Sequence, residues 1–228
     1  MRLRGIVYRA HHPRWAFAPD SGEGARRHGG RFNPVGVPAL YAARRLETAW
    51  LEAQGGFAFK AQPMTMCAYE VDCADVLDLT DATTRAAEGV APGDLSCAWE
   101  DIADRGGEPP SWALARRLIA AGHAGIVVPS FAAGAGEADA NVVFWRWSAE
   151  PPHIVRVVDH HGRLPRDDRS WRGDEPAAGE GNAAGVWSPV GGTGQRAGLP
   201  RATRSPQWRS TASKSRSAWS SGSPAPMQ

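Results

Sequence analysis

The chain has 228 residues, of which 42% are hydrophobic and 22% are charged, and this ordinary composition excludes a fibrous or globally disordered protein. It contains no run of about 18 apolar residues that could span a bilayer, and the N-terminal segment lacks the apolar centre of a secretory signal. We therefore expect a cytoplasmic protein with no membrane association.

The net charge of +2 conceals an asymmetry along the chain. Residues 1–162 carry 16 basic and 19 acidic side chains, a net of −3, whereas the remaining residues carry 10 and 5, a net of +5. Affinity for a nucleic-acid backbone depends on clustered Lys and Arg. The acidic body therefore argues against direct nucleic-acid binding.

The first 160 residues alternate short apolar runs with turn signals, which is typical of a mixed α/β domain. Strands are expected at residues 5–9, 39–43, 64–71, 125–128, 141–147 and 153–158. Helices are expected at residues 46–54 and 111–121, the second with Ser111 as N-cap and Gly122 as stop, and residues 81–87 and 97–103 could form short helices. Because strands cluster at both ends with helices between them, we predict an α+β fold with small sheets and flanking helices.

Apolar periodicity ends beyond Gly162, and from Gly173 onward Gly, Pro, Ser, Ala and Arg dominate the sequence. We expect one domain over residues 1–160 and a low-complexity, disordered basic tail over residues 161–228. Two other interpretations of the tail stay open. Its scattered tryptophans could form a basic, aromatic arm that stacks on nucleic-acid bases, or the segment could be spurious coding sequence without a function.

The densest local signal is Gly-Gly-Arg-Phe-Asn-Pro at residues 29–34. Paired glycines permit backbone conformations closed to other residues and allow close approach to a ligand. The guanidinium of Arg31 offers a planar fork of donors that suits phosphate oxygens. The alternative is a tight surface turn with a solvated arginine.

The next two segments carry Tyr41 on a predicted buried strand and Glu52 on a predicted helix. The apolar positions Leu46, Ala49, Trp50 and Ala53 share one face of that helix, and Glu52 lies off its centre. Taken singly, Glu52 could be a solvated helix glutamate and Tyr41 a core tyrosine.

Taken in order, the motifs resemble the RES-domain family, which is named for its Arg, Glu and Ser. The matching segments, which span about the first 160 residues, are Tyr8-Arg9, residues 29–34, Ala39-Leu40-Tyr41, Glu47-Thr48-Ala49, Leu51-Glu52, Val128-Pro129-Ser130 and Asn141-Val142-Val143-Phe144. The resemblance implies a fold similar to ADP-ribosyltransferases and a role as the toxin of a bacterial RES–Xre toxin–antitoxin system, with an Xre-type antitoxin as partner. It also implies an enzyme that degrades NAD by hydrolysis or phosphorolysis of the nicotinamide–ribose bond.

The resemblance places the catalytic residues at Glu52, Arg31 and Tyr41. Residues implied to bind NAD are Arg31, Tyr41, Ser130, Asn141 and Arg9. Cleavage of a bond to ribose develops positive charge on the sugar, so we assign Glu52 to orient the ribose hydroxyls and stabilise that charge. Arg31 would hold the pyrophosphate with help from Ser130, and Tyr41 would stack on nicotinamide or ribose.

This chemistry needs neither a metal nor a prosthetic group, because nicotinamide leaves as a neutral group from a cationic ring; NAD is the substrate. Cys67, Cys73 and Cys97 match neither metal-ligand nor disulfide spacings. The run at residues 131–140 could be a mobile loop over the ligand or a plain connection.

Two other functions stay open, a protein ADP-ribosyltransferase with NAD as donor and a non-enzymatic binding protein. The acceptor, whether water, phosphate or protein, depends on pocket shape.

Overall fold

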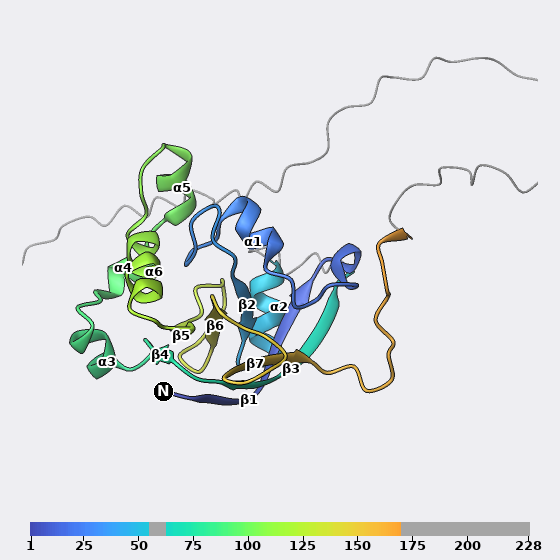
Figure 1. The fold of residues 1–228 in the computed structure, drawn as a ribbon. Coiled ribbons are helices and arrows are strands. Elements are labelled where there is room, and N and C mark those ends of the chain that lie inside the picture. The colour runs from blue at the N-terminus through green and yellow to red at the C-terminus, as the bar shows by residue number, and fades with distance from the viewer. Residues whose placement is uncertain (55–62, 170–228) are drawn as a thin grey trace, which may run out of the picture. The chain divides into compact units, whose positions relative to one another are not determined.

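A mixed β-sheet forms the centre of the computed structural model, which describes residues 1–54 and 63–169 (Figure 1). Within those ranges the sheet has seven strands in the order β4-β5-β6-β2-β1-β3-β7. Neighbouring strands are antiparallel, except for the parallel pair of β4 and β5. The strands are β1 (Leu3–His11), β2 (Leu40–Ala43), β3 (Thr65–Cys73), β4 (Val76–Asp78), β5 (Gly125–Pro129), β6 (Ala140–Phe144) and β7 (His153–Val157). The predicted α+β class is confirmed, with the strands joined in one sheet.

Each of the six expected strand ranges falls on an observed strand, and β4 is the strand that the sequence did not predict. Three residues are too few to show the alternation on which strand prediction depends. The strand expected at residues 141–147 ends at Phe144. It ends there because the backbone N–H groups of Trp145 and Arg146 both donate to the Ala124 carbonyl, which turns the chain out of the sheet.

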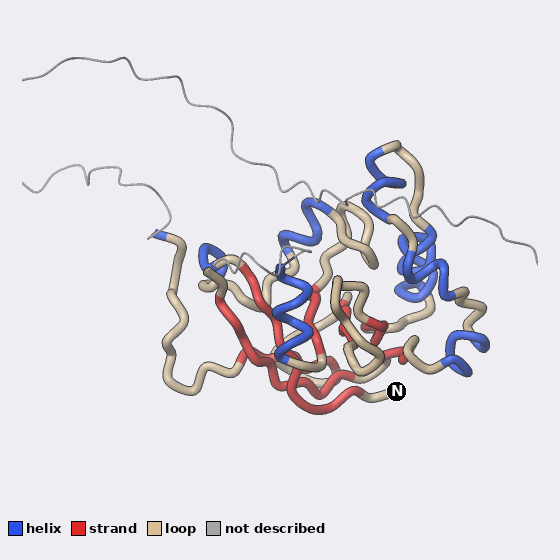
Figure 2. The backbone as a smooth tube through the Cα atoms, turned by 180° about the vertical axis from the view of Figure 1, so that it is seen from behind, coloured by secondary structure: helices blue, strands red, loops and turns tan. Residues whose placement is uncertain are grey.

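The helices gather in two places, which both ribbon views show (Figures 1 and 2). α3 (Ala82–Ala87), α4 (Pro92–Ser96), α5 (Trp99–Asp104) and α6 (Pro110–Ala120) lie towards the β4 end of the sheet, while α2 (Leu46–Gln54) packs on β1. The short α1 (Glu23–His28) and a 3₁₀ helix, η1 (Pro13–Trp15), lie between β1 and β2 in the sequence. Neither was predicted, since segments this short carry little periodic signal.

The helix α6 begins one residue before the predicted range, and its N-cap lies two residues before the predicted Ser111. The N-cap is Pro109, and Ser111 lies buried inside the first turn, where its hydroxyl oxygen accepts from the Cys97 thiol at 3.4 Å. Pro110 explains the earlier start, because proline at the first helical position has a helical φ and lacks the N–H that would go unbonded there. Gly122 ends the helix as predicted, with φ +94°.

The apolar face predicted for α2 is also wrong in part. Leu46 and Trp50 are 48% and 37% exposed, whereas Thr48 and Ala49 are buried. The helix buries Thr48 because its hydroxyl donates to the carboxylate of Asp139. The hydrogen bond from Thr48 to Asp139 therefore agrees better with the buried face of α2 than the pattern of apolar residues does.

The core lies on both faces of the sheet. Alternate residues of β5 and β6 belong to two different clusters of buried side chains. Val127 and Val142 pack with β1 and β3, and Ile126 and Val143 pack with α6 through Leu118. Since successive side chains of a strand point to opposite faces, the central strands are covered on both sides.

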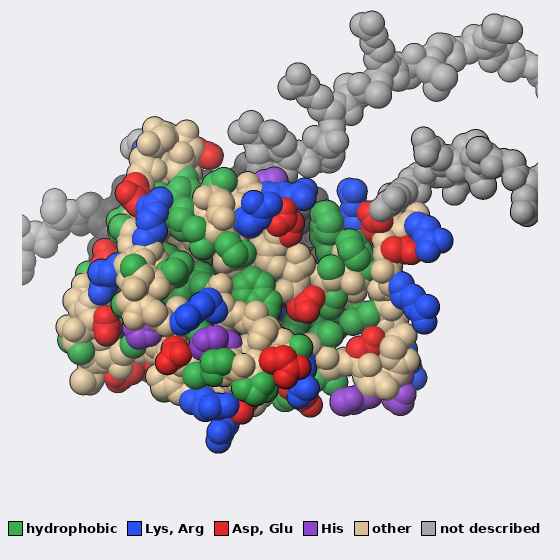
Figure 3. All heavy atoms as spheres, in the orientation of Figure 1, with side chains coloured by type: hydrophobic (Ala, Val, Ile, Leu, Met, Phe, Trp, Pro, Cys, Tyr) green, Lys and Arg blue, Asp and Glu red, His purple; other side chains and the backbone are tan. Residues whose placement is uncertain are grey.

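Outside the core, the described surface mixes charges. Basic and acidic side chains are interspersed on the face drawn in Figure 3. No helix in the described ranges is long and apolar enough to cross a membrane. Of the tail predicted at residues 161–228, residues 170–228 lie outside the described part. Leu164, just past the predicted boundary, packs against the core.

Candidate active site

The loop at residues 29–34 begins where α1 ends, and its two glycines are required by geometry. Gly29 has φ +72°, a conformation that L residues with side chains rarely adopt. A Cβ on Gly30 would lie 2.6 Å from the Tyr41 hydroxyl and 2.7 Å from Oδ1 of Asn33. Gly30 and Asn33 also bond to each other through their backbones, at 2.9 and 3.3 Å. The glycines therefore allow the loop to close tightly against β2.

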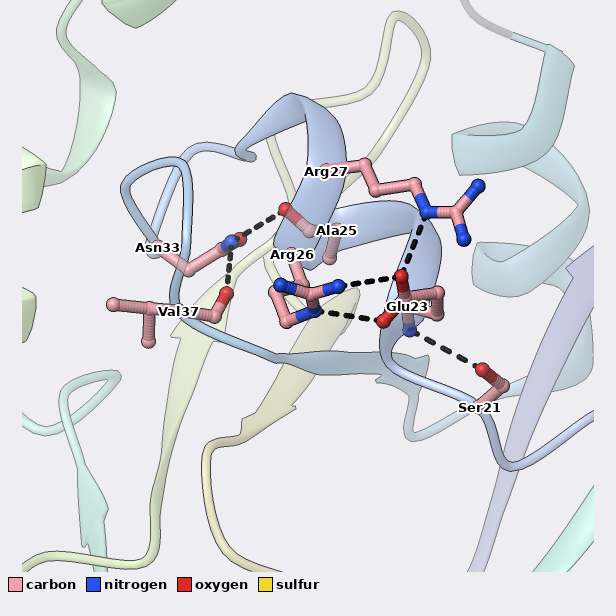
Figure 4. Close-up of polar contacts among 7 residues, drawn as sticks. All are labelled: Ser21, Glu23, Ala25, Arg26, Arg27, Asn33 and Val37. Atoms are coloured by element: carbon pink, nitrogen blue, oxygen red, sulfur yellow. Dashed lines mark hydrogen bonds and ion pairs between the residues drawn. The ribbon is translucent and has the colours of Figure 1, made fainter.

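Asn33 joins this loop to α1 and β2. It is fully buried, and its Nδ2 donates to the carbonyls of Ala25 at 2.9 Å and Val37 at 2.8 Å (Figure 4). Its Oδ1 accepts from the Tyr41 hydroxyl at 2.7 Å, and that hydroxyl accepts from the Phe32 N–H at 2.9 Å. Burial raises the pKa of Tyr41, so the hydroxyl stays neutral. These bonds occupy the hydroxyl of Tyr41 within the fold.

Arg31 is partly buried and held in place on two sides. Its Nη1 donates to the Cys97 carbonyl at 2.6 Å and to the Leu95 carbonyl at 3.4 Å. The Phe131 ring covers the guanidinium, with 4.8 Å between Cζ and the ring centroid. Burial lowers the pKa of Arg31, and the nearby Cys97 and Glu52 act in the opposite direction. The side chain is thus a fixed cation rather than a solvated surface arginine.

Glu52 lies near the end of α2, and two side chains from the β5–β6 region hold its carboxylate. Oε1 accepts from the Ser130 hydroxyl at 2.6 Å and from Nδ2 of Asn141. Ser130 directly follows β5, and Asn141 lies on β6, where it pairs with Val128. The fold therefore brings together three of the predicted site residues that lie far apart in the sequence.

A buried contact at Asp139 holds α2 against this region. Thr48 donates to Oδ1 of Asp139, and the Gly136 N–H donates to Oδ2 at 2.8 Å. The Asp139 carbonyl accepts from the Ser130 N–H at 2.8 Å. These bonds close the base of the run at residues 131–140, directly beside the Ser130 contact to Glu52.

A cavity of about 370 Å³ opens between these elements, a size usual for small-molecule sites. Among the predicted residues, Arg31, Tyr41, Glu52 and Asn141 line it. Ser130 is outside the lining and reaches the site through its bond to Glu52. The cavity thus has a cation, Arg31, and a carboxylate, Glu52, in its lining.

Arg9 lies apart from the cavity. Its Nη1 donates to the carbonyls of Pro19 at 3.1 Å and Ser21 at 3.2 Å, and Pro19 also accepts from the Tyr69 hydroxyl at 2.6 Å. Burial lowers the pKa of Arg9. In this structure Arg9 anchors the segment that leads from η1 into α1.

Two aromatic residues that the sequence analysis did not select, Trp99 and Phe131, also line the cavity. Trp99 belongs to a short helix and Phe131 follows Ser130, and neither position has a spacing that marks a site. Their place depends on contacts between distant segments, which a single sequence does not display.

The described residues contain no group of three or more His, Cys, Asp or Glu that could hold a metal ion. Arg31 and Glu52 are the charged side chains of the cavity lining, and Tyr41, Trp99 and Phe131 are its aromatic ones.

The model of the RES domain family matches residues 6–167. No curated protein matches the chain. Among solved structures, a similar one is the crystal structure of the M. tuberculosis MbcT–MbcA toxin–antitoxin complex, with 23% sequence identity over 70% of this chain and 84% of that chain and a TM-score of 0.48. A likeness at that level supports no inference about activity, whereas the family match spans most of this chain.

Proposed function

Since the chain belongs to the RES-domain family, we propose that it cleaves the nicotinamide–ribose bond of NAD and acts as the toxin of a toxin–antitoxin pair. One observation carries the enzymatic part of this proposal. The Glu52 carboxylate is held by Ser130 and Asn141 at the wall of a cavity that Arg31 also lines.

The single carboxylate suits this reaction. Glycosidases generally need two carboxyl groups, because one must protonate the leaving oxygen. Nicotinamide leaves the ribose as a neutral molecule without protonation, so one carboxylate that stabilises the developing cation is enough. Among the described residues, both bonds to Glu52 are made to Oε1, so Oε2 is the oxygen that meets the sugar. Because the carboxylate is oriented before the substrate binds, little reorganisation is needed in the transition state.

Arg31 takes the pyrophosphate in this proposal. Its two carbonyl contacts fix Nη1, and the remaining N–H groups of the guanidinium fork are the donors for phosphate oxygens. The ring of Tyr41 provides an apolar face next to Glu52 for the nicotinamide or its ribose. Ser130 acts through Glu52 and not through a phosphate.

The direct test measures free nicotinamide released from NAD by the purified protein. We expect turnover by the wild type and a loss of about 100-fold or more in Glu52→Gln, since removing one pre-oriented electrostatic group costs about that much. Glu47→Gln is the matched control, because Glu47 is an exposed glutamate on the same helix. Equal rates in both variants would refute the assignment of Glu52.

The acceptor of the ADP-ribosyl group is identified in the same assay. Free ADP-ribose in phosphate-free buffer indicates hydrolysis, and a phosphorylated product in phosphate buffer indicates phosphorolysis. Radiolabel from NAD that becomes attached to protein would instead indicate an ADP-ribosyltransferase.

The toxin role is tested in cells. Production of the chain without a partner should arrest growth and lower the cellular NAD pool, and Glu52→Gln should do neither. Co-production of an Xre-type antitoxin, the partner class proposed from the family, should restore both. Arrest with an unchanged NAD pool would contradict NAD degradation as the cause.

A further inference from the structure

The cavity extends beyond the residues assigned so far, to Trp99 on α5. Glu52 lies on α2, and the two helices stand apart in both ribbon views (Figures 1 and 2). Arg31 belongs to the loop between α1 and β2 and lines the same cavity. The cavity therefore has a carboxylate, Glu52, on one helix and an aromatic side chain, Trp99, on another.

Arg31 and Trp99 share one anchoring atom. The Cys97 carbonyl accepts from Nη1 of Arg31 at 2.6 Å and from the backbone N–H of Trp99 at 2.8 Å. The guanidinium of Arg31 and the backbone of Trp99 are thus bonded to the same short turn. A ligand whose phosphates bind Arg31 shares the cavity with Trp99.

The ring of Trp99 lies next to a second indole, that of Trp112, which is outside the cavity lining. The rings of Trp99 and Trp112 lie 6.4 Å apart at an angle of 40°, and Nε1 of Trp112 donates to the Gly30 carbonyl at 2.8 Å. Trp112 therefore connects Trp99 to the loop that carries Arg31. The other aromatic residue of the lining, Phe131, already covers the guanidinium of Arg31.

We propose that Trp99 is the stacking platform for the adenine of NAD, so that the site selects dinucleotides with a purine at the end away from the scissile bond. This inference rests on the proposed function. NAD has its pyrophosphate between two nucleosides. With the pyrophosphate at Arg31 and the nicotinamide ribose at Glu52, the adenosine takes another part of the cavity, whose lining includes Trp99. Stacking on an aromatic side chain contributes about 1–3 kcal/mol per base, or roughly 5- to 150-fold in affinity.

A binding experiment without catalysis tests the platform. Calorimetry on the full chain compares ADP, which carries adenine and pyrophosphate, with inorganic pyrophosphate. In Trp99→Ala we expect ADP affinity to fall about tenfold or more and pyrophosphate affinity to change less than about twofold, and Trp99→Phe should retain most of the ADP affinity. Trp15→Ala is the matched control, since Trp15 is 50% exposed and outside the cavity lining.

A turnover experiment tests the direction of binding. Nicotinamide mononucleotide keeps the scissile bond and lacks the adenosine. Trp99→Ala should lower kcat/KM for NAD about tenfold, mainly through KM, and leave kcat/KM for the mononucleotide nearly unchanged.

The outcomes separate this inference from the proposed function. Absence of nicotinamide release from NAD by the wild type would refute the proposed function, and the ADP measurement would still decide on Trp99. Wild-type protein that does not bind ADP, or Trp99→Ala protein that loses ADP and pyrophosphate equally or loses neither, would overturn the adenine platform.

Discussion

The two walls of the cavity are built in different ways. Arg31 projects from a loop whose polar groups bond inside the protein, through the fully buried Asn33 and the hydroxyl of Tyr41. Glu52 is an exposed carboxylate at the end of a helix, and two side chains from another part of the sheet hold it. The first wall is therefore part of the folding core, whereas the second is attached to its surface. Changes in the first should affect stability and activity together, and changes in the second should affect activity alone.

The largest effect on stability and turnover is expected for Asn33→Ala. This change leaves the Ala25 and Val37 carbonyls and the Tyr41 hydroxyl buried without their partner, at about 1–3 kcal/mol each. We expect a loss of at least about 3 kcal/mol in the free energy of unfolding, together with loss of NAD turnover, measured by urea titration and nicotinamide release. An unfolding midpoint equal to that of the wild type would contradict the conclusion that the loop carrying Arg31 is part of the folding core.

Glu52→Gln is the opposite case. Its expected loss of about 100-fold in turnover should come with a change of less than about 0.5 kcal/mol in the free energy of unfolding, because the side chain is exposed. Parallel urea titrations of both proteins check this. A large loss of stability would show that Glu52 belongs to the folding core as Asn33 does.

Thr48→Val should give an intermediate effect, since Thr48 joins the second wall to the core. The change preserves shape and removes the hydroxyl that donates to Asp139, so we expect a cost of about 1–3 kcal/mol in stability. Turnover should also fall, because the helix that carries Glu52 loses its tie to the Ser130 segment. Thr48→Ser retains a hydroxyl and should restore both quantities. Failure of serine to do so would mean that the methyl group, rather than the hydrogen bond, holds the helix.

The smallest expected effect concerns pH and involves His11, which is outside the cavity lining. Burial, followed by the charge of Arg9, lowers the pKa of His11 to about 4 from 6.5. The unfolded chain therefore binds the proton more readily, so stability is lost as pH falls from 6.5 towards 4 and levels off below that. In His11→Phe, thermal unfolding should show a flatter dependence in this range, while the pH profile of turnover stays as in the wild type. If the melting temperature of the variant depends on pH as that of the wild type does, groups other than His11 cause the loss of stability in acid.

The sequence predicted most of what depends on neighbours along the chain. Strands of four or more residues and the helix at residues 46–54 were located from periodicity. The order of motifs identified Tyr41, Glu52 and Asn141, which line the cavity with Arg31. Contacts between distant segments accounted for the rest. The hydrogen bond between Thr48 and Asp139 buries a face of α2 that the apolar pattern did not predict. Arg9 donates to the carbonyls of Pro19 and Ser21 and not into the cavity. Trp99 follows the turn at Cys97, whose carbonyl also accepts from Arg31.

The bonds at Asp139 also bear on how this chain can change over evolutionary time. They close residues 131–138 at the base, next to Ser130, so the length of that loop does not determine where Ser130 meets Glu52. Doubling the length of a flexible loop costs only about 0.6 kcal/mol. Insertions beyond the closed base can therefore lengthen the loop while Ser130 keeps its contact with Glu52. The sequence of the loop can change in the same way without moving the residues that its base holds.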